Sequence, residues 1–153
     1  MIHHLSEKHS LLSNWVAELR DVNVQNDRMR FRRNLERIGE VVAYEMSKHL
    51  PNIIVPTTTP LGIHQSKVLA EQPVLATILR AGLPLHEGLL NYFDDAENAF
   101  ISAYRNHLTE TEFEIKVEYF ASPSIDNKTL ILADPMLATG QSLISVYMIA
   151  IIL

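Results

Sequence analysis

The segment from Thr129 to Ser142 constrains the fold of this 153-residue chain more than any other. An apolar run, Thr129–Ala133, ends at Asp134 and is followed by a loop of small and hydroxyl-bearing residues that leads into a helical pattern. A strand, a loop and a helix in this order gather backbone N–H groups at the helix N-terminus, where the peptide dipoles favour an anion. Thr139 and Ser142 can add hydroxyl donors. The segment therefore predicts a site for a phosphorylated ligand.

Helical and extended patterns alternate along the rest of the chain. Apolar residues recur at one-turn spacings over residues 11–19 and again over residues 31–50, so each stretch predicts an amphipathic helix. We expect the second helix to begin after Asn26 or Asp27, since either side chain can accept a hydrogen bond from a first-turn N–H. Extended residues on both sides of Pro60-Leu61-Gly62 predict a hairpin.

A near-continuous apolar run over residues 73–79 is typical of a parallel strand that is covered on both faces. A helix through Leu90 is expected after it, and further strands are expected at 100–104, 113–119 and 129–133. The strict alternation of 113–119 predicts a half-exposed strand that returns from a hairpin. This order predicts one α/β domain over residues 1–153: a parallel sheet flanked by helices on both faces, with an N-terminal helical portion and a β-hairpin arm. Ligands of such sheets bind beyond the carboxyl ends of the strands.

Composition excludes several other classes of protein. Apolar residues make up 47% and charged residues 20% of the chain, as in ordinary globular proteins. A net charge of -5 argues against nucleic-acid binding. The absence of cysteine excludes disulfides and thiolate zinc sites and favours a reducing, cytoplasmic location, while the seven histidines show no metal-binding spacing. No stretch approaches the ~20 apolar residues of a membrane helix, so no membrane association is expected.

The loop after the last predicted strand carries a family resemblance. It reads Asp134-Pro135-Met136-Leu137-Ala138-Thr139-Gly140-Gln141-Ser142. This string resembles the phosphoribosyl pyrophosphate (PRPP) loop of uracil phosphoribosyltransferases, a branch of the type I phosphoribosyltransferases. Many type I members carry two adjacent acids here, whereas Pro135 follows Asp134, as in the uracil-specific branch. Gln141 stands where that branch more often has glycine.

Two arginines fit the same resemblance. Ile78-Leu79-Arg80-Ala81-Gly82 is similar to the family's pyrophosphate loop, in which Arg80 would neutralise the leaving group and Gly82 would let backbone N–H groups approach it. From spacing alone, it is an equally good interpretation that Arg80 caps a strand-end carbonyl or pairs with a surface acid. Tyr104-Arg105 with Thr109 resembles the family's hairpin entry, which makes Arg105 a second pyrophosphate ligand. The alternative for Arg105 is an exposed arginine on an edge strand.

Asp134 is expected to face the ribose hydroxyls and to place negative charge near the cation that develops on the sugar. The alternative is an acid that is favoured by the dipole of the following helix. The resemblance thus implies catalytic roles for Asp134 and Arg105. The PRPP-binding residues that it implies are Arg80, Ala81, Gly82, Arg105, Asp134, Pro135, Met136, Leu137, Ala138, Thr139, Gly140, Gln141 and Ser142.

The resemblance also implies substrates and effectors. The reaction joins uracil to PRPP and gives uridine monophosphate (UMP) and pyrophosphate in pyrimidine salvage. Mg²⁺ would enter bound to PRPP, with no dedicated protein metal site. GTP is an effector of some family members.

The chain ends in an apolar stretch at 143–153 and contains no Gly-Leu-Gly-Asp-Ala-Gly, the family segment that receives uracil. We therefore expect a C-terminally incomplete member of a homo-oligomer, whose last helix is either buried in a partner subunit or makes the protein poorly soluble. The first alternative to an active transferase is a catalytically incompetent fragment that retains the fold, donor binding or oligomerisation. The second is a pyrimidine-sensing, RNA-binding regulator, which the acidic net charge disfavours.

Overall fold

The computed structural model describes residues 2–107, 113–136, 140 and 144, with the backbone alone for 103–107 and 113–117. Three helices and six strands are described, in the order α1 (Leu11–Arg20), α2 (Arg28–Ser47), β1 (Asn52–Thr59), β2 (Gly62–Leu69), β3 (Val74–Leu79), α3 (Leu83–Leu90), β4 (Glu97–His107), β5 (Phe113–Ala121) and β6 (Leu130–Ala133). The predicted helices, hairpin and strands are confirmed within these residues. The helix expected after Ser142 lies outside them.

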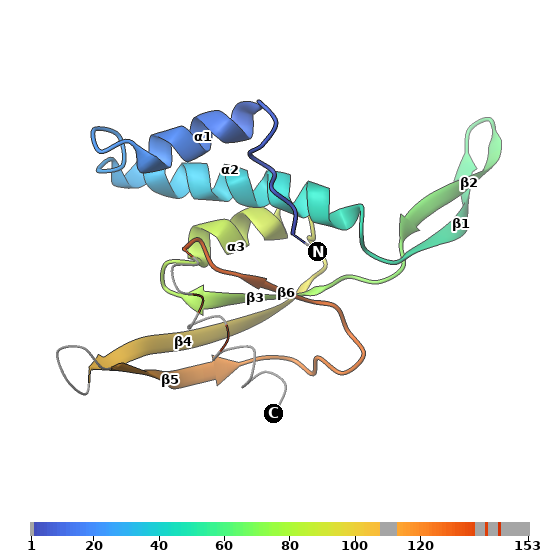
Figure 1. Cartoon of the computed structure of the whole chain (residues 1–153). Helices are drawn as coiled ribbons and strands as arrows, with labels where there is room; N and C mark the ends of the chain where they lie inside the picture. Colours follow the sequence, from blue (N-terminus) through green and yellow to red (C-terminus); the bar gives the residue numbers. More distant parts are fainter. Residues whose placement is uncertain (1, 108–112, 137–139, 141–143, 145–153) are drawn as a thin grey trace.

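The main sheet has four strands in the order β5-β4-β3-β6. β3 is parallel to both β4 and β6, and β5 runs antiparallel to β4 at the edge. The described helices lie together on one side of this sheet, with α3 nearest the strands and α1 outermost (Figure 1). The prediction of an α/β fold with a parallel sheet flanked by helices is confirmed, except that β5 is antiparallel and that the described helices cover one face and not both (Figure 1).

β3 lies at the centre of the core. Its residues from Val74 to Ile78 are all buried, as its continuous apolar sequence predicts. On one face, Leu75 packs with Ala43 of α2 and Leu89 of α3. On the other face, the strand's alternate residues Val74, Ala76 and Ile78 pack with residues of β4 and β6. Both faces of β3 are therefore covered, and only its ends are free to form a site.

Two glycines set the distance between α2 and α3. A Cβ atom added to Gly88 would lie 2.0 Å from the carbonyl oxygen of Glu36, and one added to Gly39 would lie 2.4 Å from the carbonyl oxygen of Leu85. Both obstacles are backbone atoms, which cannot rotate away. The helices therefore touch backbone to backbone, and this contact fixes α3 and the loop that precedes it.

β1 and β2 form a separate two-stranded sheet that projects from the end of α2 (Figure 1). The two strands pair in register from Asn52 with Leu69 to Thr59 with Gly62. Gly62 has a φ of 134° at the tip, a conformation that favours glycine. We call residues 52–69 the arm.

None of the described helices combines the length and the apolar character that crossing a lipid bilayer demands.

Candidate ligand site at the carboxyl edge of the sheet

The predicted ligand residues follow the carboxyl ends of two neighbouring strands. In the register of the sheet, Leu79 of β3 lies opposite Ser102 of β4, and Thr77 of β3 lies opposite Ala133 of β6. Arg80 and Asp134 are the next residues after Leu79 and Ala133, so both lie at the same edge of the sheet. Parallel strands carry their ligand sites at this edge. The structure thus brings together two motifs that are more than 50 residues apart in sequence.

A tight turn connects β3 to α3 and carries Arg80. The N–H of Gly82 donates to the carbonyl oxygen of Ile78 at 3.1 Å, and the N–H of Leu83 donates to that of Arg80 at 3.3 Å. The peptide bond between Leu79 and Arg80 is cis. Arg80 is exposed at this turn, where its guanidinium can reach an anion.

Gly82 has a packing role that the sequence did not reveal. Its φ of -72° is open to any residue, but an added Cβ would lie 2.0 Å from Oγ1 of Thr77 and 2.8 Å from the carbonyl oxygen of Ile78. Glycine is therefore required by space. The N–H of Gly82 already has a partner within the turn. Its predicted approach to pyrophosphate stays a prediction.

Thr77 connects the two loops. It is fully buried, and its Oγ1 donates a hydrogen bond to the carbonyl oxygen of Ala133 at 3.1 Å. The same hydroxyl group lies against Gly82. One side chain of β3 thus contacts both the turn that carries Arg80 and the residue before Asp134. Nothing in the apolar run of β3 distinguishes this threonine from a residue that merely fills the core.

Asp134 begins the loop after β6. Its carboxylate is half-buried, and Oδ1 accepts a hydrogen bond from the N–H of Met136 at 3.1 Å. A carboxylate has about four lone-pair sites, so this bond leaves capacity for hydroxyl groups of a ligand. Pro135 is half-buried, and Met136 is exposed.

Only part of the predicted phosphate loop is described. Gly140 has a φ of 74°, a left-handed conformation that favours glycine, and its carbonyl oxygen accepts from the N–H of Ile144 at 3.0 Å. The remaining predicted residues lie outside the described part of the chain: Leu137, Ala138, Thr139, Gln141 and Ser142. Their contribution stays a prediction.

Arg105 lies on the part of β4 that continues past the end of β3. Its backbone pairs with Ile115 of β5, three residues beyond Ser102, the partner of Leu79. The hairpin of β4 and β5 extends past the tip of β3 (Figure 1). Because β4 is parallel to β3, Arg105 lies at the same end of the strands as the carboxyl edge. The direction of the Arg105 side chain lies outside the described atoms, so its role stays a prediction.

The sequence predicts no dedicated metal site in any part of the chain. Within the described residues, the structure contains no cluster of three or more His, Cys, Asp or Glu side chains that could hold a metal ion.

His86 anchors the helix that follows Arg80. Its side chain is 2% exposed, and Nε2 lies 2.7 Å from Oδ1 of Asn98, near the start of β4. The amide nitrogen of Asn98 donates to the carbonyl oxygen of Ala96, so Oδ1 is the acceptor and Nε2 of His86 carries the proton. Nδ1 is buried without a hydrogen-bond partner. Burial lowers the pKa of His86 from its ordinary value of 6.5, because removal from water disfavours the charged form of the ring.

This environment predicts a pH dependence of stability. His86 in the unfolded chain takes up a proton as the pH falls below 6.5, whereas the folded protein resists protonation until its lowered pKa is reached. We expect the free energy of unfolding to fall across this window, by at most about 1.4 kcal/mol per pH unit from this one group. Urea unfolding at several pH values, compared with His86→Gln, isolates the contribution because the other six histidines are common to both proteins. Parallel curves for the two proteins would refute the assignment.

Comparison with known proteins identifies related sequences. The family model described as uracil phosphoribosyltransferase matches residues 6–151. The uracil phosphoribosyltransferase of Porphyromonas gingivalis is 58% identical over 140 residues, which cover 92% of this chain and 65% of that protein. The uracil phosphoribosyltransferase of Methanococcus vannielii is 37% identical over 134 residues, which cover 86% of this chain and 56% of that protein.

A solved structure supports the fold. The AQ2163 protein of Aquifex aeolicus aligns with a TM-score of 0.82 at 29% sequence identity, over 98% of this chain and 69% of that one. The chain spans less than two thirds of the length of the two curated relatives above. The family match extends over nearly all of the chain, and it includes both loops at the carboxyl edge of the sheet. The chain therefore belongs to the uracil phosphoribosyltransferase family.

Proposed function

We propose that this chain acts as a uracil phosphoribosyltransferase, which converts uracil and PRPP to UMP and pyrophosphate. One observation carries the proposal: Arg80 and Asp134 lie at the same carboxyl edge of the sheet, on loops that share the buried Thr77. The names of the relatives supply the acceptor, because both curated proteins are uracil phosphoribosyltransferases.

The proposed reaction exchanges one bond at C1 of the ribose for another. The bond from C1 to pyrophosphate breaks, N1 of uracil bonds to C1, and the N1 proton leaves to solvent. Positive charge develops on the sugar, as in the oxocarbenium-like states of glycoside cleavage. The carboxylate of Asp134 would hold the ribose hydroxyls and stabilise this charge. Arg80 and Arg105 would neutralise the departing pyrophosphate.

Residues 138–142 would receive the 5-phosphate of the donor. The left-handed conformation of Gly140 and the hydrogen bond from the N–H of Ile144 to its carbonyl oxygen support a turn in this loop. Such turns offer backbone N–H donors to anions. The hydroxyl groups of Thr139 and Ser142 would add donors. These assignments rest on the family string and on the place of the loop after β6.

Mg²⁺ is proposed as a companion of PRPP. Mg²⁺ keeps several waters and binds phosphate oxygens with one or two carboxylates, so a carboxylate such as that of Asp134 fits a metal that arrives with its ligand. When bound, the ion would add positive charge beside the pyrophosphate. GTP as an effector and a cytoplasmic location are proposals that rest on the family and on the cysteine-free composition.

The direct test is conversion of labelled uracil to UMP by the 153-residue chain with PRPP and Mg²⁺. Orotate and hypoxanthine serve as control acceptors, and a reaction without PRPP serves as the blank. We expect product with uracil as the acceptor and none with orotate or hypoxanthine. PRPP binding by calorimetry without UMP formation would support instead the alternative of a donor-binding protein without turnover. Absence of both would refute the site itself.

A further inference from the structure

The carboxyl end of β6 depends on a single neighbouring strand. In the order β5-β4-β3-β6, β6 lies at the edge and pairs with β3 alone among the described strands. It is four residues long, and its last residue, Ala133, lies opposite Thr77. At this position Oγ1 of Thr77 donates to the carbonyl oxygen of Ala133 at 3.1 Å. The start of the Asp134 loop is therefore fastened to β3 by a side chain as well as by strand pairing.

The same hydroxyl group limits where the turn that carries Arg80 can lie. A Cβ atom on Gly82 would lie 2.0 Å from Oγ1 of Thr77, so the backbone of the turn rests directly on this oxygen. The rest of α3 is held independently of Thr77, because Gly88 touches the backbone of α2 and His86 bonds to β4. Loss of the hydroxyl group should therefore shift the turn and leave the helix in place.

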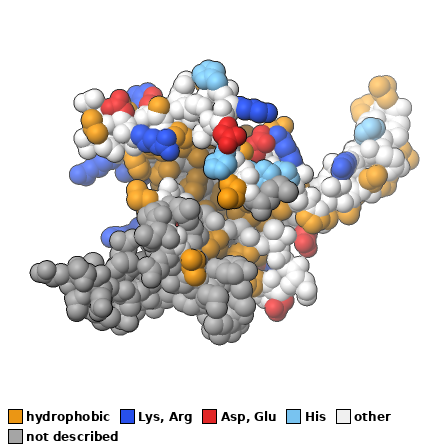
Figure 2. Space-filling model, viewed as in Figure 1, with side chains coloured by type: hydrophobic (Ala, Val, Ile, Leu, Met, Phe, Trp, Pro, Cys, Tyr) orange, Lys and Arg blue, Asp and Glu red, His pale blue; other side chains and the backbone are white. Residues whose placement is uncertain are grey.

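The overall charge of the chain does not attract a polyanion such as PRPP. The formal net charge is -5, so long-range electrostatics oppose the encounter. On the face shown in Figure 2, the lysine and arginine side chains over α1 and α2 lie among acidic ones, and Arg30 and Arg33 are paired with glutamates. Affinity for PRPP therefore has to come from the exact placement of a few groups in the site.

We propose that Thr77 is a positioning residue, which fixes the separation of the Arg80 turn and the Asp134 loop so that one PRPP molecule can bind both. The inference rests on the proposed function, in which Arg80 contacts the pyrophosphate and Asp134 contacts the ribose of the same donor. Two contacts on one ligand reinforce each other only when their separation matches the ligand, and the gain is lost when it does not. Thr77 is fully buried, so it acts on the ligand through the two loops.

The first test compares PRPP with its two parts. Inorganic pyrophosphate probes the Arg80 turn, and ribose 5-phosphate probes the Asp134 loop. Thr77→Val replaces the hydroxyl group with a methyl group, so the core stays filled while the bond to Ala133 is lost. In calorimetric titrations with Mg²⁺, we expect the affinity for PRPP to fall about 10-fold or more, and the affinity for each part to stay within about 2-fold of wild type.

Two further variants separate positioning from stability. Thr77→Ser keeps the hydroxyl group and loses only the methyl group, so its affinity for PRPP should return to within about 3-fold of wild type. Ile131→Val removes one methyl group from the core side of β6 and lowers stability without touching the bond from Thr77 to Ala133. This variant should bind PRPP as wild type does. A role of Thr77 in folding alone would give the opposite ranking.

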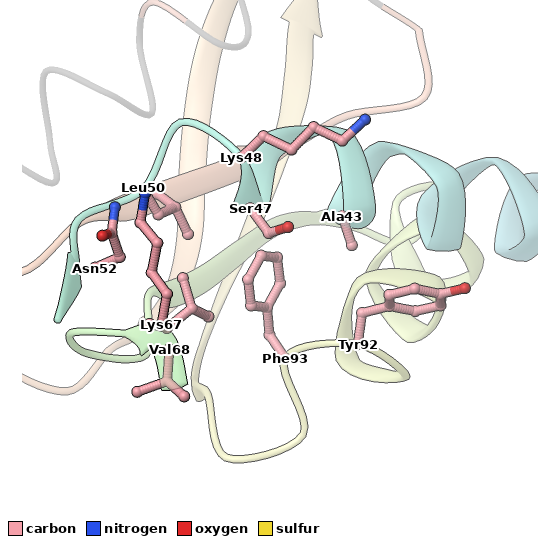
Figure 3. Close-up of a pocket in the computed structure, with 10 residues that line it drawn as sticks. Ala43, Ser47, Lys48, Leu50, Asn52, Lys67, Val68, Tyr92 and Phe93 are labelled. Atoms are coloured by element: carbon pink, nitrogen blue, oxygen red, sulfur yellow. The ribbon is translucent and has the colours of Figure 1, made fainter. Parts of the chain in front are cut away.

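A matched control lies toward the other end of β3. A cleft of about 390 Å³ at the root of the arm is formed by the end of α2, the turn after α3 and the two ends of the arm (Figure 3). Ser47, which lines this cleft, donates its hydroxyl group to the carbonyl oxygen of Tyr44 at 2.7 Å. Ser47→Ala therefore removes the same kind of bond as Thr77→Val, away from both loops, and should leave the affinity for PRPP unchanged.

The outcomes distinguish this inference from the proposed function. A wild type that binds none of the three ligands would refute the function and the site together. A wild type that binds PRPP with an affinity that Thr77→Val leaves unchanged would overturn the positioning role alone. An equal loss for PRPP and for either part, or an equal loss in Thr77→Ser, would overturn it as well. If Thr77→Val does not fold, Thr77→Ala gives the same comparison without a methyl group against Gly82.

Discussion

Arg80→Ala is expected to weaken PRPP binding by about 10–100-fold, because hydrogen bonds to charged groups contribute about 1.5–3 kcal/mol each. The guanidinium lies at the exposed turn after β3, where it can present paired donors to pyrophosphate. Its removal leaves the core unchanged, so the free energy of unfolding should stay within about 0.5 kcal/mol of wild type. Calorimetric titration with PRPP and Mg²⁺ measures the change in affinity.

Two further variants make this experiment specific. Arg80→Lys keeps the charge but loses the planar fork, so its affinity should lie between those of wild type and Arg80→Ala. Arg28→Ala removes an exposed arginine at the start of α2, far along the sequence from either loop, and should bind PRPP as wild type does. Equal affinities for Arg80→Ala and Arg28→Ala would show that Arg80 is a surface arginine without a ligand role.

Gly88→Ala is expected to destabilise the protein, against the usual preference for alanine in helices. Helix propensity alone would stabilise the variant by about 1 kcal/mol. The new Cβ would lie 2.0 Å from the carbonyl oxygen of Glu36, so α2 and α3 have to separate. Overpacking typically costs 1–3 kcal/mol, and backbone obstacles place this site at the upper end or beyond. We expect a net loss of about 2 kcal/mol in urea unfolding.

The sign of this change is the informative quantity. Asn14→Ala, at an exposed position inside α1, should show the propensity gain without the clash. Gly39→Ala should resemble Gly88→Ala, because its Cβ would lie 2.4 Å from the carbonyl oxygen of Leu85. A Gly88→Ala protein that is more stable than wild type would mean that the two helices do not touch through their backbones.

Local sequence patterns predicted the elements well for physical reasons. The second helix begins after Asp27, whose Oδ1 accepts from the N–H groups of Met29 and Arg30 at 3.1 and 3.0 Å. Such a cap depends only on a few neighbouring residues, as does the turn at Pro60-Leu61-Gly62. The strand at Phe100–Tyr104 was predicted too short, because β4 is extended at both ends by pairing with β3 and β5.

Contacts between distant residues were harder to predict. The approach of Gly39 to Gly88 and the bond from Thr77 to Ala133 join residues about 50 positions apart, and no periodicity marks them. No sequence pattern indicates that His86 is buried with one ring nitrogen that lacks a hydrogen-bond partner. The hairpin of β1 and β2 was predicted, but its projection from the body depends on contacts with other parts of the molecule, which the local sequence does not encode. The predicted loop positions after β3 and β6 are confirmed, while their ligands stay proposals.

The contact of Thr77 with both loops limits how the site could be moved to another protein. A graft that carried only residues 80–82 and 134–142 would lose the Thr77 hydroxyl group, which bonds to Ala133 and lies against Gly82. The smallest unit that could be transferred therefore includes the middle of β3, and Thr77 and Gly82 have to be transferred together. A design that uses the proposed phosphate-binding edge would therefore also have to include part of the hydrophobic core beneath it.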